Sequence, residues 1–97
     1  MGNIPNLKPE RFNMRYVIAV FSSITMANRV KKEMDRQPGF VSLMHSPTGI
    51  PENGCSYSLR FREEMLERII AVAARLGIKI KNFYVEGENH TYERMDI

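Results

Sequence analysis

Residues 15–23 read Arg-Tyr-Val-Ile-Ala-Val-Phe-Ser-Ser, and this stretch gives the first indication of the fold. Residues 16–21 are apolar on both alternating faces, which is typical of a central strand covered on both sides. Ser22 and Ser23 follow directly, and serine hydroxyls commonly accept a hydrogen bond from an amide in the first turn of a helix. The stretch therefore predicts a buried strand that passes straight into a helix.

The remaining sequence predicts five more elements. Apolar residues recur at helical spacing over residues 24–37 and 63–76, and strands are predicted at residues 40–45, 55–61 and 78–85. The order is strand, helix, strand, strand, helix, strand. Right-handed crossovers turn this order into an α+β ferredoxin-like β-α-β-β-α-β plait, a four-stranded antiparallel sheet with two helices on one face. In this plait the third strand lies between the first and the second.

The 97 residues are enough for one domain. We expect an extended leader at residues 1–14, the folded domain at residues 15–85, and a polar, acidic tail at residues 86–97. One face of the predicted sheet stays uncovered in a monomer, whereas residues 16–21 are apolar on both sides. A homodimer that packs through this face is therefore one expected assembly.

Composition excludes several classes of protein. With 43% hydrophobic and 26% charged residues, the chain resembles an ordinary folded protein rather than a disordered segment. It contains no apolar run near the length of about 18 residues that a membrane span needs, and no secretory signal, so we expect a cytoplasmic protein. The net charge of +3 is small, and residues 56–61 lack the RNA-recognition signature, so nucleic acid is not an expected partner.

Cys55 is the only cysteine, which excludes an intrachain disulfide and a cysteine-rich zinc site. The two histidines show no metal-ligand spacing, and the chain has no glycine-rich phosphate loop. We therefore expect neither a metal nor a cofactor. Any chemistry of Cys55 would be that of a free thiol in a reducing compartment.

The predicted topology places Cys55 beside the start of the first helix. The first two strands end at the sheet edge where the third begins, next to Ser22, Ser23 and the loop 46–54. Free amides and the partial positive charge of a helix N-terminus favour a thiolate over a thiol. Gly54 has no side chain to cover the sulfur. Cys55 is thus the candidate reactive thiol, and Ser22, Ser23 and Gly54 are the candidate anion-stabilising residues.

Each candidate also has a purely structural interpretation. Cys55 shares its alternation with Tyr57 and Leu59, and free cysteines are among the residues most often buried in a core. His45, at the edge of the loop, would either form a Cys/His pair with Cys55 or be an ordinary strand-end residue. Arg60 would either attract an anion or simply be solvated.

Two segments, Phe21-x-Ser23-x-x-x-Ala27 and residues 54–61, carry a family resemblance. Over roughly residues 16–85, the chain resembles the selenium/sulfur carrier-like proteins, a family of small bacterial domains. The first, Phe21-x-Ser23-x-x-x-Ala27, is similar to the Phe-x-Ser-Thr-x-x-Ala of that family. The second, residues 54–61, is similar to its Cys-Gly-Leu-x-Leu-Arg-Phe segment. This chain departs from the pattern at residues 24 and 56, and at residues 48–49, where a Pro-Arg pair is common.

The resemblance implies a protein that holds sulfur or selenium on its single cysteine as a persulfide or selenopersulfide. It also implies a donor such as a cysteine desulfurase. Such a protein carries a group and is not a turnover enzyme by itself. The residues alone leave a second function open, namely a non-catalytic binding or regulatory domain that dimerises through its sheet face.

Overall fold

The structure is a computed structural model, and it describes residues 15–37, 39–51 and 56–96. The predicted leader at residues 1–14 lies outside the described residues, as do Gly54 and Cys55. The described part of the chain forms five strands and two α-helices, in the order β1 (Tyr16–Phe21), α2 (Ile24–Met34), β2 (Val41–His45), β3 (Tyr57–Arg62), α3 (Leu66–Leu76), β4 (Asn82–Glu86) and β5 (Tyr92–Met95). Short 3₁₀ turns, Glu63–Met65 and Glu88–His90, precede α3 and β5.

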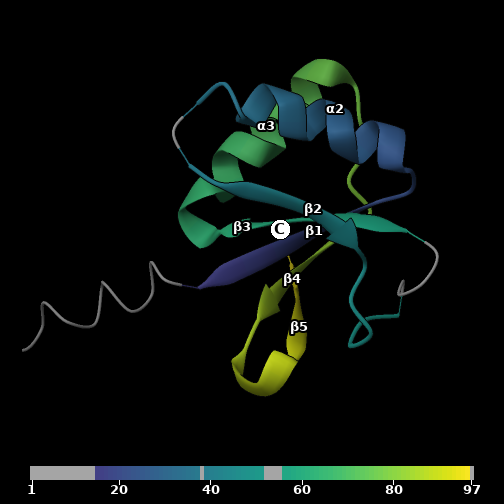
Figure 1. The fold of residues 1–97 in the computed structure, drawn as a ribbon, viewed down its shortest axis with the longest axis vertical. Helices are drawn as coiled ribbons and strands as arrows, with labels where there is room; N and C mark the ends of the chain where they lie inside the picture. Colours follow the sequence, from purple (N-terminus) through teal and green to yellow (C-terminus); the bar gives the residue numbers. More distant parts are fainter. Residues whose placement is uncertain (1–14, 38, 52–55, 97) are drawn as a thin grey trace, which may run out of the picture.

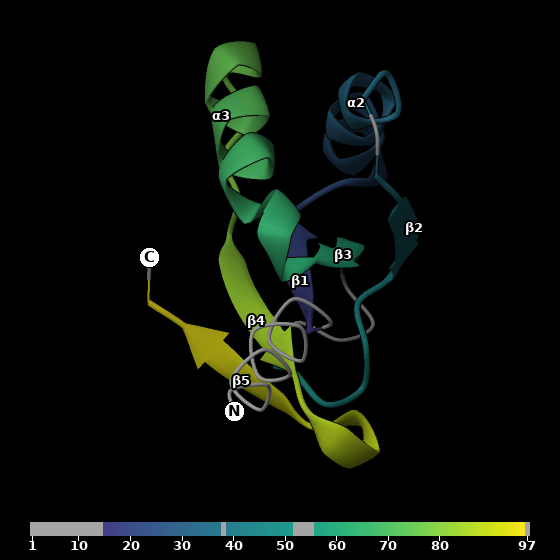
Figure 2. The ribbon, with the colours of Figure 1, turned by 90° about the vertical axis from the view of Figure 1, so that its left-hand side faces the viewer.

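The strands form one antiparallel sheet in the order β2-β3-β1-β4-β5. As expected, β3 lies between β1 and β2, and both helices lie on the same side of the sheet (Figures 1 and 2). The molecule is therefore an α+β protein. None of the described helices has the length and apolar character needed to cross a membrane.

The prediction of four strands and a polar tail was wrong. Residues 86–97 contain the end of β4 and the whole of β5, which pairs with β4 through Glu86 opposite Tyr92 and Phe83 opposite Met95. The turn between them is closed by a hydrogen bond of 2.7 Å from the Gly87 amide to the Thr91 carbonyl. The folded domain thus extends beyond residue 85. Charged side chains are compatible with β5 because an edge strand can turn them toward water.

Other predicted elements are confirmed with shifted ends. The first helix begins at Ile24 as predicted, with Ser23 as its N-cap, but it ends at Met34 instead of residue 37. The last predicted strand begins at Asn82, so residues 78–81 are a connection instead of strand. The third strand runs from Tyr57 to Arg62, and residue 55, its predicted start, lies outside the described residues.

The core lies on both faces of β1. On the helix side, alternate residues of β1 pack against α2 and α3 in one buried cluster that includes Val17, Ala19, Phe21, Ala27, Val30, Met34, Ile69, Val72 and Ala73. On the other side, Ile18 and Val20 pack with Ile50, which follows β2, and with Tyr84 of β4. The two-sided apolar pattern of β1 is therefore satisfied within one chain, and the homodimer stays a prediction.

Candidate functional site

The start of β3 lies beside the ends of β1 and β2. Tyr57, its first residue, pairs with Phe21 on one side and with His45 on the other. The predicted convergence of the three strands at this edge is thus confirmed for the described residues. Cys55, two positions before Tyr57 in the chain, lies outside them, so its exposure and its contacts stay predictions.

The N-terminus of α2 follows Phe21 directly, at the same edge. The Ser23 hydroxyl accepts a hydrogen bond of 3.3 Å from the Met26 amide, and the Ser23 carbonyl accepts one of 3.2 Å from Ala27. The Ser22 side chain is exposed, and its hydroxyl lies 3.7 Å from the sulfur of Met26. Both hydroxyls are therefore engaged in the first turn of α2: Ser23 accepts from the Met26 amide, and Ser22 donates to the Met26 sulfur.

Three buried serines lie where the loop after β2 meets the segment that leads into β3. The Ser46 hydroxyl is 2.9 Å from that of Ser56 and 2.8 Å from that of Ser58. The Ser46 amide also donates a hydrogen bond of 3.1 Å to the Ser56 carbonyl. These contacts tie residue 56, the neighbour of Cys55 in the chain, to the end of β2. Sequence reasoning missed this serine cluster, because only the β2–β3 pairing brings its members together.

His45 packs against an aromatic ring at the same edge. Its imidazole lies 4.7 Å from the ring of Tyr57, centroid to centroid, with an angle of 37° between the planes. The residue is exposed at the end of edge strand β2. The contact with Tyr57 is sufficient to explain its position, and the Cys/His pair stays untested because Cys55 lies outside the described residues.

Arg60 makes contacts within the protein, so the interpretation of Arg60 as a simply solvated side chain was wrong. Its Nε donates a hydrogen bond of 2.8 Å to Glu86, and its guanidinium lies 3.7 Å from the centre of the Tyr16 ring. Burial and the charge of Glu86 raise the pKa of the nearby Tyr92 phenol. The charge of Arg60 is balanced by a carboxylate, which makes it a poor site for an external anion.

The comparison with known protein families covers the chain from β1 into β4. The sequence model of the family described as "Putative Se/S carrier protein-like" matches residues 16–85. The chain belongs to this family. The match runs from the first residue of β1 into β4 and includes Cys55, whereas β5 lies beyond it. Searches of curated proteins and of solved structures give no match. Among the described residues, no group of three His, Cys, Asp or Glu side chains is placed to hold a metal ion.

Proposed function

We propose that this Se/S carrier-like protein holds a sulfur or selenium atom on Cys55, as a persulfide or selenopersulfide, and passes it to an acceptor. The observation that carries the proposal is the family match, which spans the segment with the chain's only cysteine. We further propose that β2-β3-β1-β4 corresponds to a ferredoxin-like plait, to which β5 is added. A free thiol of this kind suits the reducing cytoplasm.

The position of β3 supports a thiolate at Cys55. Tyr57 pairs with Phe21, and α2 begins three residues after Phe21. The first-turn amides of α2 and the partial positive charge of its N-terminus lie close to the start of β3 for this reason. A negative charge on sulfur gains from such a neighbour, and Ser22 would add a hydrogen-bond donor if its hydroxyl turned from the Met26 sulfur to the thiolate.

The transfer step requires no external oxidant. The Cys55 thiolate attacks the terminal sulfur of a persulfide on the donor enzyme, and a bond forms between the two sulfur atoms. The S–S bond of the donor breaks, and the donor cysteine leaves with the electron pair and takes up a proton. The same exchange in reverse delivers the atom to an acceptor thiol.

The buried serine cluster supports a fixed position for the segment that follows Cys55 in the chain. Ser46 holds both Ser56 and Ser58 through their hydroxyls, so the segment that enters β3 is anchored next to Cys55. The alternative function, a domain that dimerises through its sheet face, has less support. Ile50 packs on Ile18 and Val20 there within one chain.

The proposal is tested by intact mass measurement after incubation with a cysteine desulfurase and either cysteine or selenocysteine. We expect a gain of one sulfur or selenium atom that a reducing thiol removes, and no gain in Cys55→Ser. Ser22→Ala should load more slowly, since it lacks the exposed hydroxyl. Absence of any thiol-sensitive gain on Cys55, while an established carrier loads under the same conditions, would contradict the proposal.

A further inference from the structure

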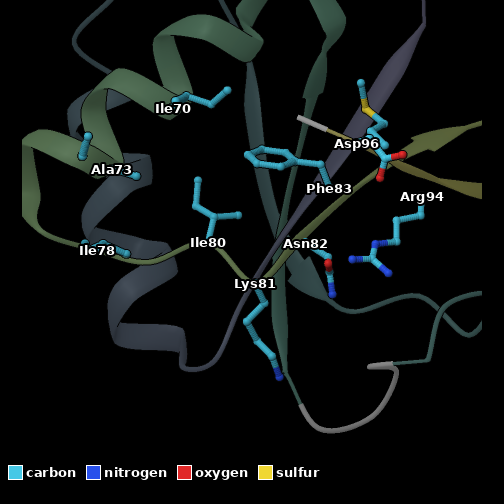
Figure 3. A pocket seen from close by; sticks show the side chains of 11 residues that line it. Ile70, Ala73, Ile78, Ile80, Lys81, Asn82, Phe83, Arg94 and Asp96 are labelled. Atoms are coloured by element: carbon cyan, nitrogen blue, oxygen red, sulfur yellow. The ribbon is translucent and has the colours of Figure 1, made fainter.

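The two edge strands of the sheet, β2 and β5, differ in charge. Strand β5 contains Glu93 and Arg94, and Asp96 follows it directly; Figure 3 shows the charged groups of Arg94 and Asp96 at this edge. Strand β2 reads Val-Ser-Leu-Met-His and contains no lysine, arginine, acidic residue, proline or glycine. Charged side chains and prolines are the usual means by which an edge strand avoids pairing with another chain. By this criterion β5 is protected from such pairing and β2 is not.

The outer side of β2 has backbone groups without a partner in the sheet. The Ser46 amide donates to the carbonyl of Ser56, the residue opposite. Because an antiparallel ladder alternates residue by residue, the even-numbered residues of β2 also bond to β3. Leu43 and His45 therefore direct their N–H and C=O groups away from the sheet. Within the described part of the chain, no hydrogen bond outside the ladder reaches these groups.

The free groups lie in the accessible part of the edge. Val41 has the same orientation but is only 1% exposed, whereas Leu43 is half-buried and His45 is exposed. Phe40, directly before β2, is 73% exposed. Figure 2 shows β2 at the rim of the sheet, beside α2, with no other described strand or helix beyond it. The edge thus offers a short row of backbone donors and acceptors that a further strand can reach.

We propose that β2 pairs with β2 of a second copy of the chain, antiparallel, about a two-fold axis at Met44. This register places Leu43 of each copy opposite His45 of the other, in the type of pair that exchanges both hydrogen bonds. Every outward N–H and C=O group of these two residues then has a partner, and no charged side chain faces another. The edge is thus complementary to its own antiparallel copy, as a closed two-fold dimer requires.

This assembly differs from a dimer through the sheet face, and it does not depend on Cys55. The pairing involves a short strand, so the interface is at the small end of the known range and the dimer is weak. We expect a dissociation constant on the order of 10 to 100 µM. Sedimentation of the full chain under reducing conditions, from about 1 µM to 1 mM, measures it.

His45→Pro tests the backbone group. Proline is tolerated on an edge strand where the N–H faces outward, and it removes the amide that the second copy needs. We expect the dissociation constant to rise by about tenfold or more. His45→Ala is the matched control, because it also loses the contact of the imidazole with Tyr57 but keeps the amide. We expect His45→Ala to leave the dissociation constant unchanged.

Arg94→Pro makes the same backbone change at the other edge. The Gly87 amide donates to the Thr91 carbonyl opposite, and by the same alternation the Arg94 amide points away from the sheet. We expect Arg94→Pro to leave the dimer intact. Circular dichroism and thermal unfolding establish that each variant is folded.

Amide hydrogen exchange measured by NMR needs no variant. The Met44 amide should be protected at every protein concentration, because it bonds to β3 within one chain. The amides of Leu43 and His45 should become protected only as the concentration rises through the dissociation constant.

Three results would overturn the proposal: a protein that stays monomeric up to about 1 mM, a dimer that His45→Ala weakens as much as His45→Pro, or a dimer that Arg94→Pro dissociates. Protection of Leu43 and His45 that does not change with concentration would also contradict it. Sedimentation of Cys55→Ser separates this proposal from the carrier function, since only the carrier function requires the thiol.

Discussion

Arg60 on β3 reaches Glu86 on β4 with a hydrogen bond of 2.8 Å from its Nε. Strand β1 lies between these two strands, and the guanidinium crosses it over the Tyr16 ring. About a third of the Arg60 side chain is exposed, against 15% for Glu86. The pair therefore links three neighbouring strands on the face away from the helices, in a partly buried setting where an ion pair is screened less than at the surface.

Arg60→Lys should destabilise the fold by about 1 to 2 kcal/mol, because an ammonium group neither stacks on Tyr16 nor presents the Nε donor to Glu86. Urea unfolding measures the free energy. Arg62→Lys is the control, since Arg62 lies on the same strand and is exposed. If Arg60→Lys and Arg62→Lys lower the free energy of unfolding equally, the contacts of Arg60 across β1 add no stability beyond that of an exposed arginine.

Ser46→Ala should cost about 1 to 3 kcal/mol, because it removes the hydroxyl that contacts both Ser56 and Ser58 and leaves the buried Ser58 hydroxyl without this partner. The control is Ser42→Ala on the same edge strand, whose hydroxyl lies outside the serine cluster and whose loss should change stability by less than about 0.5 kcal/mol. Equilibrium unfolding compares them. A Ser46→Ala protein as stable as the wild type would show that the cluster does not anchor the loop.

Glu63 should stabilise the fold in a pH-dependent way. The Arg15 guanidinium donates two hydrogen bonds to it, of 3.0 and 2.8 Å, and holds the pKa of the Glu63 carboxyl below its usual range. A lowered pKa in the folded state gives a contribution that is complete above the unfolded value of about 4.3 and is lost as the pH falls further.

Glu63→Gln should therefore reduce stability by about 0.5 kcal/mol at pH 7, the usual size for an exposed pair, and the difference should fade below pH about 4. Glu64→Gln serves as the control, because Glu64 is exposed and makes no ion pair among the residues that the structure describes. Unfolding curves at several pH values test this. A difference that persists unchanged at pH 3 would rule out the ion pair as its cause.

Removal of residues 87–97 should destabilise the domain by about 2 kcal/mol or more, because it exposes the edge of β4 and the apolar groups that Tyr92 and Met95 partly cover. A milder variant, Met95→Ala, should show part of the loss, and Glu93→Gln, on the same strand, almost none. Thermal unfolding compares the three. An unaltered melting temperature in the truncated protein would restore the interpretation of this segment as a tail.

Strong patterns in the sequence predicted the centre of the fold. Residues 16–21 are apolar on both faces because β1 is buried on both. Ser23 caps α2 at the position that the sequence pattern predicted. β5 was not predicted, because Glu93 and Arg94 make its sequence polar. Such residues are compatible with a strand at the edge of a sheet, which pairs with a neighbour on one side only. A usable signal was present in the turn before it, where Asn89 takes a φ of 59°, a conformation that asparagine tolerates better than most residues.

The partners of the polar side chains were not predictable in the same way. Arg60 and Glu86 are 26 residues apart, and Ser46 and Ser58 are 12 apart. Only strand pairing brings each pair together, and local spacing contains no information about it. The convergence of β1, β2 and β3 at one edge was predictable, because it follows from the order of the elements.

We propose that Cys55 is a thiolate within reach of other molecules. Its most direct test is the rate at which iodoacetamide alkylates the native protein from pH 5 to 10, with urea-unfolded protein as the reference. We expect rapid labelling of the folded protein at pH 7, with an apparent midpoint below the value of about 8.5 for an ordinary thiol. Labelling that occurs only after unfolding would contradict it and would make Cys55 a residue of the core.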